Sequence, residues 1–114
     1  MDKLILAVTT PYANKVVKEA VTGWIEMVKK EDHAALMIDT AEKMYSDARS
    51  ELCKIQCPAF IISGSHDKTV GNDAPEEFSQ GISRTEVYIY EGLGHGTFTE
   101  AKDFYDRVLA FLNC

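Results

Sequence analysis

The sequence is poor in cysteine, and the few cysteines it has are not paired by spacing. Only 3 of the 114 residues are cysteine, at positions 53, 57 and 114, and none forms a C-x-x-C pair. An odd number of cysteines without an export signal predicts reduced thiols in a cytoplasmic protein. Cys53 and Cys57 are a poor match to the ligand pairs of a zinc site. We therefore expect no metal and no cofactor.

The sequence also lacks an excess of positive charge and a long hydrophobic run. Lys and Arg number 12 against 18 Asp and Glu, a formal net charge of −6. This balance argues against nucleic acid and against an anionic membrane as partners. The uncharged run from Leu4 to Thr10 is too short to cross a bilayer, and with Asp2 and Lys3 before it this run does not form a signal peptide.

What the sequence does have is the composition of a folded domain, 46% hydrophobic and 26% charged. The continuous apolar run Leu4–Val8 predicts a strand buried on both faces, as in a parallel sheet. From about residue 14 to residue 30 the apolar residues follow the spacing of one helical face. Asp32 is a suitable cap for a second helix, whose apolar positions continue to Leu52.

The remaining segments alternate in the same way. Ala59–Ile62 predicts a second buried strand, residues 73–81 a short helix and Val87–Tyr90 a third strand. Thr97, with Glu100 three residues later, predicts the start of a last helix that continues to about residue 112. Strands separated by helices imply right-handed crossovers and parallel pairing. The predicted fold is therefore α/β, a single three-layer domain with a short parallel sheet of about three strands and flanking helices.

Two loops at the carboxyl ends of the predicted strands contain the residues that can perform chemistry. Asp67 follows the second strand and His95 follows the third. In open α/β sheets functional groups gather at this edge, and a carboxylate beside an imidazole can orient it and stabilise its charged form. Taken one at a time, Asp67 fits an ordinary turn and His95 an ordinary loop histidine. Their positions at the ends of two successive strands would bring the carboxylate and the imidazole side by side.

At this point the sequence resembles a known family. "CPAFIISGSHDKTV" followed by "VYIYEGLGHG" resembles the C-terminal half of an α/β hydrolase. The resemblance implies that Asp67 is the catalytic acid, in a G-x-x-D pattern, and that His95 is the catalytic histidine. It implies a partial α/β-hydrolase fold, with the first strand in residues 1–10, shortened cap-like helices in 11–56, and the acid strand, histidine strand and last helix in 57–114.

The nucleophile of that family is missing from these residues. A nucleophile elbow has the form G-x-S-x-G, and the only glycines four apart, Gly92 and Gly96, have Gly94 between them. Neither Ser63 nor Ser65 lies in an elbow. We therefore expect a C-terminal hydrolase fragment that is inactive alone and hydrolyses a small ester or amide when complemented by an N-terminal half that carries the nucleophile. The alternatives are a non-catalytic fragment that self-associates through the exposed strand Leu4–Val8, and a small binding module.

Several large apolar residues in the two cap-like helices have an ambiguous role. Trp24, Met27, Met37, Met44 and Tyr45 could line an apolar substrate pocket or form helix core. The sequence leaves both interpretations open.

Overall fold

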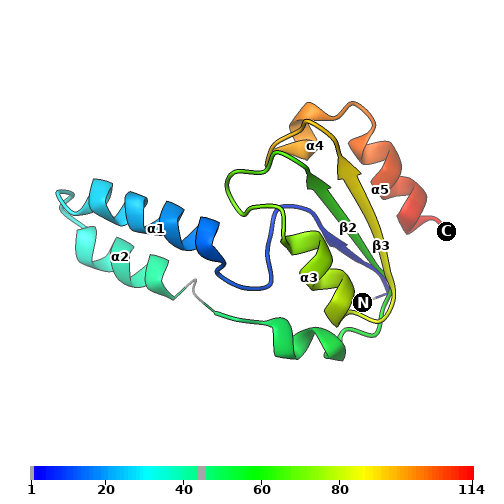
Figure 1. The fold of residues 1–114 in the computed structure, drawn as a ribbon, viewed down its shortest axis with the longest axis horizontal. Coiled ribbons are helices and arrows are strands. Elements are labelled where there is room, and N and C mark those ends of the chain that lie inside the picture. The colour runs from blue at the N-terminus through cyan, green and yellow to red at the C-terminus, as the bar shows by residue number, and fades with distance from the viewer. Residues whose placement is uncertain (1, 44–45) are drawn as a thin grey trace.

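The structure, a computed structural model, describes residues 2–43 and 46–114. Within these ranges helices and strands alternate along the chain (Figure 1). In chain order they are β1 (Leu4–Leu6), α1 (Lys15–Val28), α2 (Ala34–Glu42), the 3₁₀ helix η1 (Arg49–Lys54), β2 (Ala59–Gly64), α3 (Ala74–Gly81), β3 (Thr85–Tyr90), α4 (Thr97–Glu100) and α5 (Phe104–Leu112).

The strands form one parallel sheet in the order β1-β2-β3. Ile61, in the middle of β2, is paired with Leu6 of β1 on one side and with Val87 of β3 on the other. Each connection between strands contains helix and returns the chain to the same end of the sheet, which is the geometry of a parallel crossover. The predicted α/β class with a three-stranded parallel sheet is confirmed.

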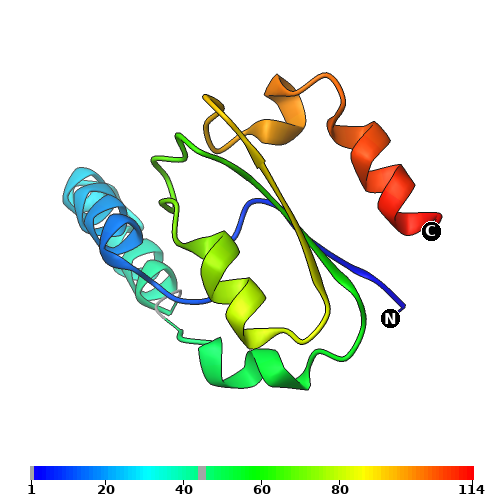
Figure 2. The same ribbon diagram turned by 45° about the vertical axis from the view of Figure 1, so that its right-hand side comes forward.

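Helices cover both faces of the sheet, and β2 is buried along its whole length. On one face Ile61 packs with α3 and η1, and on the other Phe60 and Ile62 pack with α5. Figure 2 shows these two groups of helices on opposite sides of the strands. The fold therefore has three layers: α3 with η1, the sheet, and α4 with α5. The central strand β2 contributes side chains to the hydrophobic cluster on each face of the sheet.

Helices α1 and α2 lie side by side and project from this sandwich (Figure 1). The radius of gyration is 15.8 Å, whereas a compact domain of this length has about 13 Å. This hairpin of helices occupies the part of the chain that the sequence assigns to a cap. The division into first strand, cap-like helices and catalytic segment stays a prediction.

The first strand is shorter and less buried than the apolar run predicts. β1 ends at Leu6, its three residues are only half-buried, and Val8 is 43% exposed. The reason is its position: in the described part of the chain β1 pairs with β2 alone and forms an edge of the sheet. An apolar run predicts that a strand will be covered, but not which elements cover it.

The second predicted helix is wrong in extent. α2 starts at Ala34 after His33, which makes no side-chain cap, and Leu52 belongs to η1. Leu52 is buried against α3, where its side chain meets Gly81 so closely that a Cβ there would lie 2.6 Å away. Leu52 therefore belongs to the hydrophobic cluster on the sheet and not to the second cap-like helix.

The last predicted helix is two helices. α4 ends at Glu100, Ala101 is extended, and α5 starts at Phe104. The N-cap of α4 is Gly96, so Thr97 is the first residue of the helix, where its side chain is buried and caps nothing. The Glu100 carboxylate accepts a hydrogen bond from the Gly94 N–H at 3.2 Å. Of the two residues predicted to form a capping box, Thr97 therefore packs in the interior, and Glu100 contacts the loop after β3 that carries His95, which we call the histidine loop.

A group of polar side chains joins α5 to β3. The Tyr90 hydroxyl donates to Asp103 Oδ1 at 2.8 Å, and the Arg107 guanidinium donates to Asp103 Oδ2 at 2.7 Å and to the Tyr88 hydroxyl at 2.9 Å. Arg107 also lies over the Tyr88 ring, 3.6 Å from its centroid. Burial, together with the hydrogen bond to Asp103, raises the pKa of Tyr90 to about 12.

This raised pKa predicts how stability responds to alkaline pH. Tyrosine in an unfolded chain ionises with a pKa near 10, so neutral Tyr90 stabilises the fold below about pH 10 and this contribution is lost as pH rises towards 12. In urea unfolding at pH 8, 10 and 11, Tyr90→Phe should lose less stability with rising pH than the wild-type chain. Tyr105→Phe, at a side chain that is 63% exposed, is the control and should behave like wild type. Equal losses for all three chains would refute the assignment.

Candidate active site

Asp67 and His95 lie side by side at the carboxyl edge of the sheet. Asp67 follows β2 and His95 follows β3, and because these strands are parallel neighbours both loops leave the sheet at one edge. His95 Nδ1 lies 2.9 Å from Asp67 Oδ2. The adjacency predicted from the sequence is therefore present in the structure.

The Asp67 carboxylate is almost completely enclosed, with its side chain 2% exposed. Its other oxygen, Oδ1, accepts hydrogen bonds from the backbone N–H groups of Thr69 at 2.9 Å and Val70 at 3.0 Å. A buried carboxylate is costly unless such partners replace water. The loop after β2 turns back so that its own N–H groups hold this carboxylate, and the second oxygen is left for His95.

His95 presents one side of its ring to Asp67 and remains 33% exposed. A carboxylate can only accept a hydrogen bond, so Nδ1 donates, and in the neutral imidazole Nε2 then carries the lone pair. In the chain as far as it is described, no hydrogen bond engages Nε2. This is the arrangement that a general base requires: one nitrogen fixed, the other free to take a proton.

Close backbone approach joins the two loops. A Cβ on Gly64 would lie 2.3 Å from the Leu93 carbonyl oxygen and 2.4 Å from that of Gly94, so only glycine fits there. Beside it the His66 N–H donates to the Leu93 oxygen at 2.8 Å, and the Ser65 hydroxyl accepts from the Gly92 N–H at 2.8 Å. Ser65 thus joins the two loops to each other.

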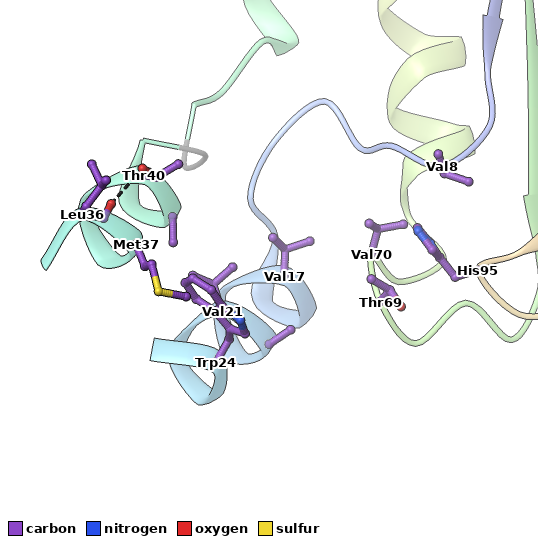
Figure 3. A pocket seen from close by; sticks show the side chains of 12 residues that line it. Val8, Val17, Val21, Trp24, Leu36, Met37, Thr40, Thr69, Val70 and His95 are labelled. Carbon is purple, nitrogen blue, oxygen red and sulfur yellow. Dashed lines mark hydrogen bonds between the residues drawn. The ribbon is translucent and has the colours of Figure 1, made fainter. Parts of the chain in front are cut away.

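An apolar cavity of about 670 Å³ opens beside His95. Figure 3 shows His95, Thr69 and Val70 on its sheet side and Trp24 and Met37 on the side of α1 and α2. Among the described residues the lining consists of Val8, Val17, Ala20, Val21, Trp24, Leu36, Met37, Thr40, Ala41, Thr69, Val70 and His95. His95 is the only ionisable side chain among them, so the cavity favours an uncharged apolar group.

The ambiguous apolar residues of the cap-like helices can now be placed. Trp24 and Met37 line the cavity, whereas Met27 is 77% exposed and does not. Met44 and Tyr45 lie outside the described residues. Sequence reasoning missed Val17, Val21 and Val70 as lining residues. For the two on α1 the signal was available, because they share the helical face of Trp24.

Two kinds of feature are absent from the described residues. Among residues 2–43 and 46–114 no three His, Cys, Asp or Glu side chains are grouped as metal ligands. No helix in the same ranges is long and apolar enough to cross a bilayer.

Comparison with known proteins shows similarity to α/β hydrolases. No family model matches the chain. The AB hydrolase superfamily protein YisY of Bacillus subtilis is 33% identical over 64 residues, 56% of this chain and 24% of YisY. A 2-hydroxy-6-oxononadienedioate/2-hydroxy-6-oxononatrienedioate hydrolase of Pseudomonas putida is 27% identical over 90 residues, 75% of this chain and 32% of that enzyme.

The fold comparison extends over the whole chain. MGS-M2, an α/β hydrolase from a Medee basin deep-sea metagenome, superposes with a TM-score of 0.80 at 17% identity, over 99% of this chain and 56% of MGS-M2. The chain therefore has the fold of part of an α/β hydrolase, and its sequence is similar to members of that superfamily. The chain spans less than a third of the curated relatives and about half of the solved one.

The close approach at Gly64 gives a test of how the two loops are held together. Gly64→Ala would place a methyl group against two carbonyl oxygens, and overpacking of this kind costs about 1–3 kcal/mol. Gly94→Ala is the matched control in the facing loop, because its Cβ would come no closer than 3.7 Å to any neighbour. Urea unfolding should show a clear loss for Gly64→Ala and little change for Gly94→Ala. Equal effects of the two substitutions would contradict the described packing.

Proposed function

We propose that this chain supplies the acid and the base of an α/β-hydrolase active site that cleaves esters or amides. The observation that carries the proposal is the hydrogen bond between His95 Nδ1 and the buried Asp67 carboxylate, with Nε2 left free beside an apolar cavity. Similarity to α/β hydrolases and the order of Asp67 before His95 in the chain support the same roles.

In the proposed reaction His95 moves the protons. Its Nε2 takes the proton of a nucleophile hydroxyl as that oxygen attacks the substrate carbonyl, and Asp67 stabilises the imidazolium that results. The imidazolium then gives this proton to the departing alcohol or amine, leaving an acyl group on the nucleophile. Water, activated by the same nitrogen, releases the acid and restores the nucleophile.

The nucleophile of this proposal lies in a segment outside the 114 residues. No G-x-S-x-G elbow occurs among them, while the hydrolases to which the chain is similar are two to four times as long as the shared part. Such a segment is either another part of a longer protein or a separate polypeptide. We propose that it pairs with the outer edge of β1, where Leu4, Ile5 and Leu6 are half-buried and, among the residues that the structure describes, have no second neighbour strand.

The substrate class follows from the cavity lining. A cavity of about 670 Å³ with an almost entirely apolar wall fits an uncharged alkyl or aryl group. The same cavity would let the chain bind such a group without cleaving it, which is the alternative function of a small binding module.

The test is co-expression of this chain with a hydrolase segment that carries a G-x-S-x-G elbow, followed by assay of p-nitrophenyl esters. His95→Ala should lower turnover by several orders of magnitude, about 10⁶-fold where a triad acts as a unit. Asp67→Asn should lower it by about 10⁴-fold, because the imidazole is then held in the wrong tautomer. His66→Ala is the matched control. His66 is exposed in the loop after β2 that carries Asp67, which we call the acid loop, so this substitution should leave turnover unchanged.

Other outcomes decide between the alternatives. Turnover that is equal with and without His95 would reject the proposed catalytic role. Ester binding without turnover would favour the binding module. Sedimentation that shows a stable dimer, with β1 amides protected from exchange only in the dimer, would show that the partner of β1 is a second copy of this chain and not a hydrolase segment.

A further inference from the structure

Asn14 is a buried polar residue that the proposed reaction does not use. It lies between β1 and α1 and is only 5% exposed, although asparagine usually stays at the surface. The acid loop packs tightly against it: Gly71 adopts a positive φ of 81°, and a Cβ there would lie 3.3 Å from Val16 and 3.7 Å from the Asn14 amide nitrogen. The start of α1 and the acid loop therefore touch at this point.

The Asn14 side chain both accepts and donates a hydrogen bond. Its Oδ1 accepts from the Val17 N–H at 3.0 Å, which caps the first turn of α1. Its Nδ2 donates to the Val70 carbonyl oxygen at 2.7 Å, across 56 residues of sequence. A capping role alone would require only the first of these bonds.

Val70 continues this connection to the candidate active site. Its N–H donates to Asp67 Oδ1, and Asp67 Oδ2 is bonded to His95. One unbroken path of hydrogen bonds thus runs from the first turn of α1 through Asn14, Val70 and Asp67 to the imidazole. Val70 and the α1 residue Val17 also line the cavity.

We infer that Asn14 is a positioning residue that couples α1, the Trp24-bearing wall of the cavity, to the Asp67–His95 pair. This inference rests on the proposed function for its meaning in catalysis. By fixing the Val70 carbonyl, Asn14 holds the turn whose N–H groups hold Asp67, so the cap-like helices and the acid–base pair keep one relative position.

Asn14→Asp separates the coupling role from the capping role. Aspartate caps a helix about as well as asparagine, so its oxygen still accepts from the Val17 N–H. It has no N–H for the Val70 oxygen and places a carboxylate against that carbonyl. Asn14→Ala removes both bonds. Asn72→Asp is the control, because it adds the same charge at an exposed position of the same loop.

Amide exchange and the His95 Nδ1–H resonance, both measured by NMR on the full chain, provide the readout. In Asn14→Asp the Val17 amide should keep its protection, the Thr69 and Val70 amides should exchange about tenfold faster, and the His95 resonance should broaden. Asn14→Ala should also expose Val17, and Asn72→Asp should match wild type. If Asn14→Asp does not fold, Asn14→Ser replaces it, since its shorter side chain can cap α1 without an amide donor.

Two results would overturn the inference. In the first, Thr69, Val70 and His95 behave in Asn14→Asp as in wild type. In the second, Val17 loses protection together with them, which would mean that Asn14 only holds the helix. Neither readout needs a nucleophile or turnover. Absence of hydrolysis with normal coupling would therefore reject the proposed function alone.

Discussion

The buried carboxylate of Asp67 is the constraint on which the candidate site depends. Both of its oxygens are engaged, Oδ1 by the N–H groups of Thr69 and Val70 and Oδ2 by the His95 ring. A carboxylate that is 2% exposed tolerates the loss of such partners poorly. The loop after β2 must therefore close on itself, and the loop after β3 must come close enough to bring the imidazole within reach.

The surrounding fold meets these two requirements. Parallel pairing of β2 with β3 brings both loops to one edge, and Gly64 lets the Leu93 and Gly94 carbonyls approach without a side chain between them. Glu100 holds the histidine loop from α4, and Asn14 holds the acid loop from α1. The site is thus supported from the sheet below and from the cap-like helices beside it.

Sequence patterns predicted the parts of the molecule that local chemistry determines. The buried run of β2, ending in Ser63 and Gly64, and the positions of Asp67 and His95 after neighbouring strands were sufficient to expect the acid–base pair. The length of β1 was not predictable, because the burial of Val8 depends on which strands lie beside it. The break between α4 and α5 was not predictable either. The apolar spacing continues through Ala101, but this residue is extended, and the Glu100 side chain before it is bonded to the Gly94 N–H.

The roles of Gly64 and Asn14 could not be obtained from sequence for the same reason. Each depends on a group about 30 or more residues away, and periodicity reports only on neighbours along one element. Apolar spacing likewise identified the helical face that carries Trp24 but left open whether it lines a cavity or packs in a core. The structure resolves this, because α1 and α2 project from the sheet and leave a cavity between them and His95.

The central claim is that these 114 residues assemble the Asp67–His95 interaction by themselves. A double-mutant cycle in urea unfolding tests it directly, with Asp67→Asn, His95→Gln and the double variant of the isolated chain. Residues in such contact should show a coupling free energy of about 1–3 kcal/mol, so the double variant should lose clearly less stability than the sum of the two single losses. Additivity within about 0.5 kcal/mol would contradict the claim.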